Sequence, residues 1–266
     1  MELLGYFAAG CIGIALGLIG GGGSILTVPV LVYLFHIQPK LATSYSLFIV
    51  GSTSLAGAIT NYLKGWVDIK TALLFGISSI STVFISRRYI LPAIPENITR
   101  LGTYMITTSM LIMVLFALLM VMASYSMINN RHTIVKSREN KINSIPSLMT
   151  YGILIGLVTG LLGAGGGFLI IPTLVLIIGL PMKEAIGTSL MIIAMNSLLG
   201  FTGDLGKVKM DWRLLLYLTT IAIAGIIIGS AIGKKIPGAK LKKGFGWFVL
   251  VMGVFILIKE LIINNQ

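Results

Sequence analysis

Two glycine-rich segments are the parts of this chain best suited to bind a ligand. They run from Gly20 to Ser24 (GGGGS) and from Gly163 to Gly167 (GAGGG), each inside a long apolar stretch. Because glycine is a poor helix former, each segment predicts a break in a helix. The helix that restarts after a break opens with amide N–H groups that lack an intrahelical partner and carry the positive end of the helix dipole. Two such ends facing one cavity would bind a small anion.

Polar side chains on the same predicted helices are further candidates for contact with an anion. Hydroxyl and amide groups are neutral donors that can replace water around an oxyanion. The alternative is that these groups only hydrogen-bond between helices and that the glycines only allow close helix packing. The predicted binding residues are Gly20, Gly21, Gly22, Gly23, Ser24, Ser44, Ser46, Asn61, Gly163, Gly165, Gly166, Gly167, Thr188, Ser189 and Asn196.

Three aspartates stand near predicted helix ends. Asp68 and Asp211 each precede a hydrophobic run, which is typical of a helix N-cap. Asp204 is the candidate proton carrier, because it follows a hydrophobic helix at the position that Asn61 occupies in the first half of the chain. Ser24 is expected to cap the helix that restarts after the first glycine segment.

The chain contains no motif of a known enzyme class. Neither glycine segment completes the phosphate-binding pattern G-x-x-x-x-G-K-[ST] or the dinucleotide pattern G-x-G-x-x-G, and no G-x-S-x-G nucleophile motif occurs. The two histidines, His36 and His132, are too far apart for an HExxH zinc site. The single cysteine, Cys11, allows neither an internal disulfide nor a cysteine metal site. We therefore predict a protein that is not an enzyme and has no cofactor and no metal.

Composition places these helices in a membrane. Of 266 residues, 56% are hydrophobic and 11% are charged, whereas a soluble domain has about 25% charged residues. The run from Leu101 to Met127 has no charge, and about 20 apolar residues suffice to cross a bilayer. A net charge of +12 fits basic loops beside anionic lipid better than a nucleic-acid partner. The expected partners are a small anionic substrate and membrane lipid, with no nucleic acid, and association into a homo-oligomer is left open.

The chain repeats itself with an offset of 143 residues. The offset aligns Gly17 to Gly23 with Gly160 to Gly166, and it aligns residues of several other types: Pro29 with Pro172, Lys40 with Lys183, Lys64 with Lys207, and Asp68 with Asp211. Matches of proline, lysine and aspartate do not follow from shared hydrophobicity. We predict a first transmembrane repeat over residues 1–128, a polar basic linker over 129–146 and a second transmembrane repeat over 147–266.

The predicted fold is an all-α integral membrane protein with 8 to 10 membrane segments. Each repeat has a glycine-broken first helix (3–35 and 147–180) followed by three transmembrane helices, near 41–63, 70–91 and 101–128, and near 184–203, 211–233 and 244–262. If the broken segments return on themselves, the repeats are inverted and 12 of the 20 Lys and Arg lie on one side, with 8 on the other. If they cross, the two sides tie. Because the positive-inside rule prefers an asymmetry, inverted repeats are favoured.

The repeated segments GLIGGGGSILTVPVLVYL and GLLGAGGGFLIIPTLVLIIG resemble the sulfite exporter TauE/SafE family of membrane permeases. The stretch AIGTSLMIIAMNSLLG (185–200) and the turn GKVKMDWRL (206–214) extend the likeness over nearly the whole chain. The resemblance implies transport of sulfur-containing anions such as sulfite, sulfoacetate or related sulfonates, commonly proposed as export. It also implies that the site lies at Gly20 to Ser24 and Gly163 to Gly167.

We therefore expect a permease for small anions that works by alternating access in the plasma membrane of a prokaryote. One alternative is an anion channel, which would give large unitary currents. Another is a membrane scaffold or partner subunit that transports nothing, in which glycine substitutions would affect stability alone.

Overall fold

The computed structural model describes residues 2–21, 23–37, 39–86, 89, 97–101, 104–129, 145–162, 167–203 and 210–258. These residues form helices and one short β-hairpin. In chain order the elements are α1 (Glu2–Ile19), α2 (Gly23–Tyr33), α3 (Pro39–Tyr62), α4 (Ile69–Ile85), β1 (Asn97–Leu101), β2 (Tyr104–Thr107), α6 (Thr108–Asn129), α7 (Ile145–Leu162), α8 (Gly167–Pro172), the π-helix η2 (Thr173–Ile177), α9 (Met182–Thr202), α10 (Trp212–Lys235) and α11 (Gly238–Ile258).

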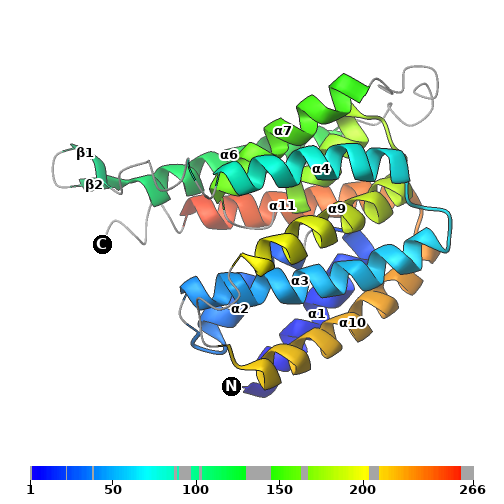
Figure 1. The fold of residues 1–266 in the computed structure, drawn as a ribbon, viewed down its shortest axis with the longest axis horizontal. Coiled ribbons are helices and arrows are strands. Elements are labelled where there is room, and N and C mark those ends of the chain that lie inside the picture. The colour runs from blue at the N-terminus through cyan, green and yellow to red at the C-terminus, as the bar shows by residue number, and fades with distance from the viewer. Residues whose placement is uncertain are drawn as a thin grey trace.

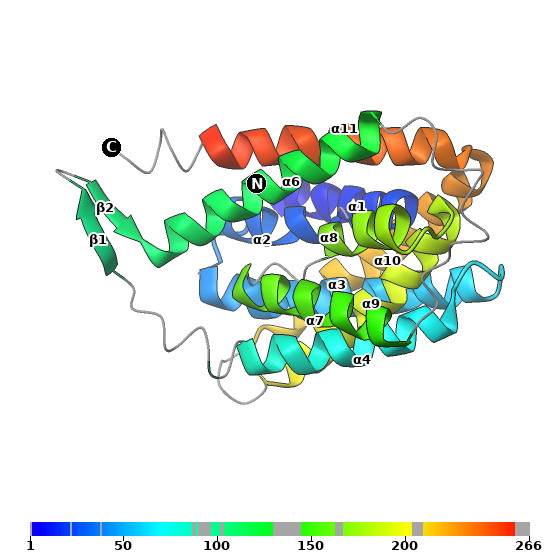
Figure 2. The same cartoon turned by 90° about the horizontal axis from the view of Figure 1, so that it is seen from above.

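The long helices pack side by side along the longest axis of the molecule (Figure 1). Seen from above, α6 and α11 form one edge of the bundle and α4 and α7 lie toward the opposite edge (Figure 2). Helices α1, α10, α3 and α9 lie between these edges, and the β1–β2 hairpin projects beyond the helices at one end.

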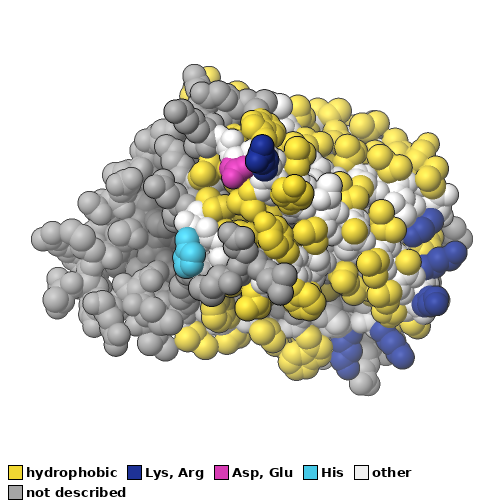
Figure 3. Space-filling model, turned by 90° about the horizontal axis from the view of Figure 1, so that it is seen from below, with side chains coloured by type: hydrophobic (Ala, Val, Ile, Leu, Met, Phe, Trp, Pro, Cys, Tyr) yellow, Lys and Arg dark blue, Asp and Glu magenta, His cyan; other side chains and the backbone are white. Residues whose placement is uncertain are grey.

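The outer surface of the bundle suits lipid. Four helices are long and apolar enough to cross a membrane, at Leu41–Tyr62, Met182–Thr202, Trp212–Lys235 and Gly238–Ile258, and α1, α4 and α7 contain shorter apolar stretches. Large apolar side chains point outward, with Phe7 73% and Phe84 63% exposed. Figure 3 shows hydrophobic side chains spread across one face and most of its Lys and Arg gathered at one end. A contiguous apolar exterior marks a membrane interaction, so the chain is an integral membrane protein.

The β-hairpin differs from the helix predicted over residues 101–128. Helix α6 begins only at Thr108, and β1 pairs antiparallel with β2, with Leu101 opposite Tyr104. The two strands are rich in isoleucine, threonine and tyrosine, which favour extended backbone. The absence of charge therefore predicted the helix but not its start. Most other helix ends agree with prediction to within one to three residues, as expected for frayed termini, but α4 ends at Ile85 and α11 begins at Gly238, each six residues from its predicted bound.

The first broken segment turns back on itself, so that α2 runs antiparallel to α1. Gly23, at the start of α2, lies against α1, where an added Cβ would be 2.6 Å from the carbonyl oxygen of Ile12. At the other end of α2, the Phe35 ring packs on Tyr6 with 5.7 Å between centroids and fills the space beside Gly5. In the second half, Leu148 at the start of α7 shares a core cluster with Ile178, just after η2. The first segment therefore forms a hairpin, and the second segment has both of its ends in one core cluster.

Helices α3 and α9, which correspond under the offset of 143, run antiparallel through the middle of the bundle. Gly200 packs on Leu47, Gly51 on Leu198 and Gly57 on Leu190. Residue numbers therefore increase along α3 as those of the contacting residues decrease along α9. This direction agrees with the predicted inverted arrangement. The duplication itself, with its boundaries at 1–128 and 147–266, remains a prediction from sequence.

Helix α1 packs most closely against a helix of the other half, α10. Gly13 lies against the carbonyl oxygen of Ala222, and Gly229 lies against that of Ile14, with no room for a side chain at either glycine. The matching contact occurs between α7 and α4. There Gly156 lies against the backbone of Ser79, whose carbonyl oxygen would be 2.6 Å from a Cβ added at Gly156. Small residues permit such close packing in membranes. The first helix of each glycine-broken segment therefore packs on a helix of the opposite half of the chain.

Candidate functional site

The first glycine segment ends one helix and starts another. The amide of Gly20 donates to the carbonyl oxygen of Leu16 at 2.7 Å, which closes the last turn of α1. Gly20 has a φ of 83°, in the left-handed region that glycine adopts without strain. An added Cβ there would lie 2.9 Å from Ser189 Oγ and 3.1 Å from Ile186 Cα. The predicted break is confirmed, and its conformation requires glycine.

The two breaks meet inside the bundle. The backbone of Gly21 lies directly against the carbonyl oxygen of Gly167, the first residue of α8, so Gly21 could not carry a side chain without displacement. Helix α7 ends at Leu162, before the second break. Gly22, Gly163, Gly165 and Gly166 lie outside the described residues. Two discontinuous helices from opposite halves therefore come together at one place.

Ser24 lies within α2 and is not its first residue, because the helix begins at Gly23. Ser24 is the second residue of the helix, so the expected cap does not coincide with the residue that precedes α2, and the side chain of Ser24 lies outside the described parts. The predicted N-caps are confirmed. Asp68 Oδ1 accepts from the amide of Thr71 at 3.1 Å, and Asp211 Oδ1 accepts from the amide of Leu214 at 3.2 Å. The candidate proton carrier, Asp204, lies outside the described residues.

The predicted hydroxyl groups are buried, but only one of them is shown next to a break. Ser189 faces Gly20, while its Oγ donates to the carbonyl oxygen of Ile186 at 2.9 Å. Thr188 Oγ1 accepts from the amide of Asp68 at 3.0 Å and so ties α9 to the start of α4. Ser44 and Ser46 are buried in α3 near its start.

Asn61 and Asn196 lie at different levels of the bundle. The Asn61 Nδ2 donates to the carbonyl oxygen of Gly57 at 2.8 Å, and the residue lines a pocket near the end of α3. The Asn196 Nδ2 donates to Ser79 Oγ at 3.1 Å, which joins α9 to α4. The carbonyl oxygen Oδ1 of Asn196 is buried and accepts no hydrogen bond from the part of the chain that the structure describes.

Asn196 belongs to a polar seam in α3 and α9, formed by Thr53, Ser54, Asn196 and Ser197. Other hydroxyls in the bundle donate to a carbonyl one turn earlier, as Thr60 in α3 does to Ala56 at 2.8 Å. The seam residues each have a buried oxygen without a partner, and Thr53 and Ser54 match Asn196 and Ser197 under the offset of 143. An unpaired buried polar group costs about 1–3 kcal/mol, so each of these oxygens lowers the stability of the bundle.

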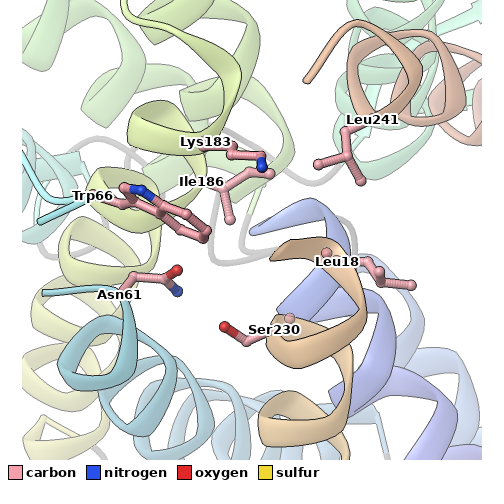
Figure 4. A pocket seen from close by; sticks show the side chains of 9 residues that line it. Leu18, Asn61, Trp66, Lys183, Ile186, Ser230 and Leu241 are labelled. Atoms are coloured by element: carbon pink, nitrogen blue, oxygen red, sulfur yellow. The ribbon is translucent and has the colours of Figure 1, made fainter. Parts of the chain in front are cut away.

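A small, partly open pocket lies beside the first break, at one end of the bundle. Its polar lining is Asn61, Trp66, Lys183 and Ser230, and glycine and aliphatic residues complete it. Figure 4 shows Asn61 and Ser230 pointing toward each other across the space, with Trp66 and Lys183 above them. Ile186 lines the pocket and also contacts Gly20, so the pocket adjoins the break.

Two lysines flank the Trp66 ring. Lys64 Nζ lies 5.4 Å and Lys183 Nζ 5.1 Å from its centroid, within the range of cation–π attraction. Lys64 Nζ donates to Ser230 Oγ at 2.8 Å, and Lys183 Nζ donates to the carbonyl oxygen of Lys234 at 3.0 Å. Lys64 lies in the loop after α3, where burial first and the nearby charge of Lys234 second lower its pKa.

Sequence reasoning did not assign Trp66, Lys64, Lys183 or Ser230 to a site. A signal was present, because Lys64 and Lys183 both belong to lysine pairs matched between the halves. The sequence does not show that Lys64 from one pair and Lys183 from the other lie against the same tryptophan.

The comparisons with known proteins agree over nearly the whole chain. The model of the family described as "Sulfite exporter TauE/SafE" matches residues 5–256. A "Probable membrane transporter protein" of Xylella fastidiosa (strain 9a5c) is 27% identical over 255 residues, covering 94% of this chain and 92% of the relative. The "Probable membrane transporter protein YdhB" of Bacillus subtilis (strain 168) is 25% identical over 251 residues, covering 92% and 96%.

An archaeal relative, a "Probable membrane transporter protein" of Methanocaldococcus jannaschii, is 25% identical over 264 residues, covering 93% of this chain and 92% of its own. No solved structure matches this chain.

Proposed function

Because this chain belongs to the sulfite exporter TauE/SafE family and is a membrane transporter, we propose that it carries small oxyanions, in particular sulfur-containing ones such as sulfite or sulfoacetate. The anion binds where the two glycine-broken helices meet and crosses by alternating access. The observation that carries the proposal is the contact between the Gly21 backbone and the Gly167 carbonyl, which joins the two breaks at one point.

The chemistry at this point favours an anion over a cation. Helix α2 begins at Gly23, and the first amides of a helix have no intrahelical acceptor and carry partial positive charge. Transporters with internal repeats use such discontinuous helices to hold anionic groups near the middle of the bilayer. Among the described residues, the acidic side chains stand at or beside helix ends: Glu2, Asp68, Glu184 and Asp211. A cation would therefore find no carboxylate at the break in these parts of the chain.

Alternating access requires two arrangements of the same bundle around a fixed site. The antiparallel pair α3 and α9 supports this proposal, because related halves that face opposite sides can exchange their conformations. Export needs no coupling ion, since an anion leaving a cell that is negative inside gains about 2.3 kcal/mol per charge at 100 mV.

Flux of radiolabelled sulfite into liposomes that contain the purified protein tests the proposal. We expect saturable flux that unlabelled sulfite or sulfoacetate competes away. Gly21→Ala should abolish it, because an added Cβ would collide with the Gly167 carbonyl. Gly244→Ala is the matched control, since a Cβ there meets no atom within 4 Å. An absence of saturable flux for sulfite, sulfate, sulfonates and small carboxylates alike would refute the proposal, as would full activity of Gly21→Ala.

A further inference from the structure

The lysines that gather at one end of the bundle are of two kinds. Most of them are exposed, and these suit anionic lipid and the cytoplasmic side of a membrane: Lys70, Lys234, Lys235, Lys240 and Lys243. Lys64 and Lys183 are partly buried, and each is held by a hydrogen bond and by the Trp66 ring. The two lysines at the pocket are therefore fixed in place.

Neither of these two ammonium groups is neutralised within the described residues. The acceptors of Lys64 are Ser230 Oγ at 2.8 Å and the Ser230 carbonyl at 3.4 Å, and the acceptor of Lys183 is the Lys234 carbonyl. All are uncharged. Both ammonium groups lie close to one ring, at 5.4 Å and 5.1 Å from its centroid, so an anion bound beside that ring would be attracted to both.

The pocket is lined by Lys183 and lies beside Lys64, which donates to the lining residue Ser230, and it has other properties of an anion site. Asn61 and Ser230 project into it from opposite sides (Figure 4) and can supply neutral hydrogen bonds. Leu18, Ile186 and Leu241 exclude water from the rest of the wall, which strengthens attraction between charges. Because Ile186 also contacts Gly20, an anion in the pocket stands beside the break.

We propose that this pocket is a loading site for a compact oxyanion with two negative charges. The lysines come one from each half of the chain, and a single negative charge would compensate only one of them. The positive-inside rule assigns this basic end to the cytoplasm, so the site would receive the anion before export. The inference rests on the proposed function for its role in transport, but the binding itself can be measured without transport.

The test is equilibrium binding of two matched anions to the full-length protein in neutral detergent. Sulfate and methanesulfonate share a sulfonyl centre and differ in charge. In a Trp212→Phe/Trp247→Phe protein, Trp66 is the sole tryptophan and reports occupancy by its fluorescence. At constant ionic strength we expect a saturable response to sulfate and an affinity for methanesulfonate at least about 10-fold weaker. If this double variant does not fold, titration calorimetry of the unmodified protein measures the same ratio.

Substitutions identify the lysines responsible. Lys64→Met and Lys183→Met should each weaken sulfate binding about 10- to 100-fold, the value of one charge-assisted hydrogen bond. Lys235→Met is the control, because Lys235 is an exposed lysine in the last turn of α10 that does not line the pocket, whereas Lys183 lines it and Lys64 donates to its lining residue Ser230. Equal affinities for the two anions would overturn the proposal. An equal loss in Lys235→Met and Lys64→Met would also overturn it, because the effect would then be general charge.

A phosphate headgroup of an anionic lipid could bind by the same interactions. A further experiment distinguishes the lipid headgroup from free sulfate. Adding phosphatidylglycerol to the neutral micelles should leave the sulfate response of Trp66 intact. If the lipid alone changes the fluorescence and removes the sulfate response, the pocket is a lipid site and the proposal fails. Sulfate binding without sulfite flux would contradict the proposed function alone, whereas flux without binding at Trp66 would overturn the loading site alone.

Discussion

Replacing Gly20 by alanine tests whether the break is fixed by its backbone and by its surroundings. The φ of 83° costs an alanine about 1–2 kcal/mol. The new Cβ would also lie 2.9 Å from Ser189 Oγ and 3.1 Å from both Ile171 Cδ1 and Ile186 Cα. Overpacking of this kind costs about 1–3 kcal/mol more. The total expected loss is about 2–5 kcal/mol, with the strain concentrated where the two breaks meet.

The matched control is Gly65→Ala in the loop after α3. Gly65 has a φ of 72°, but an added Cβ there meets nothing within 4 Å, so this variant measures the backbone cost alone. Thermal unfolding of the two detergent-solubilised variants should show the larger fall in apparent melting temperature for Gly20→Ala. Sulfite flux should be lost in Gly20→Ala and retained in Gly65→Ala. Equal melting temperatures and equal flux in the two variants would refute the reasoning.

Three further predictions concern other parts of the bundle. Gly13→Leu should prevent stable folding, because its side chain would push α1 away from the Ala222 backbone, whereas Gly244→Leu should be tolerated; size-exclusion profiles distinguish them. Thr53→Val removes an unpaired buried hydroxyl and should leave the melting temperature equal or higher; a fall of several degrees would show that the hydroxyl is paired. Sulfate affinity at Trp66 should decline as pH rises through the pKa of Lys64, because only its ammonium form attracts the anion. Burial first and the nearby charge of Lys234 second lower that pKa, so the loss should begin below the pH at which an ordinary lysine deprotonates. Lys64→Arg should keep binding at alkaline pH, and an unchanged profile in this variant would contradict the assignment.

Local physical chemistry made much of the fold predictable. Runs of apolar residues placed the long helices, and the Gly20 segment placed the end of α1, because glycine affects the backbone at its own position. Asp68 and Asp211 could be identified as caps for the same reason, since an N-cap acts within three residues of itself. The β1–β2 hairpin was missed, because an uncharged stretch of threonine, isoleucine and tyrosine suits either a strand or a membrane helix.

The contacts that build the site depend on pairings between distant parts of the chain. Gly225, Gly229 and Gly233 recur every fourth residue along α10, but only the fold shows that Gly225 and Gly229 lie against α1. Trp66 becomes part of a site only because the α3–α9 crossing brings Lys183 to the loop after α3. Matched lysines in the two halves were a signal for function, but spacing along a chain does not reveal which matched residue meets which.

The packing of α1 and α7 on helices of the opposite half also constrains the order in which the protein can assemble during synthesis. Helix α1 is among the first segments to leave the ribosome, and α10, the helix it packs against most closely, is among the last. The roughly 190 residues between them take about 10–40 s to synthesise at about 5–20 residues per second. During that interval the glycine-lined side of α1 has only lipid or the membrane-insertion machinery to contact. The nascent chain is therefore most exposed to misassembly and degradation before its last third emerges.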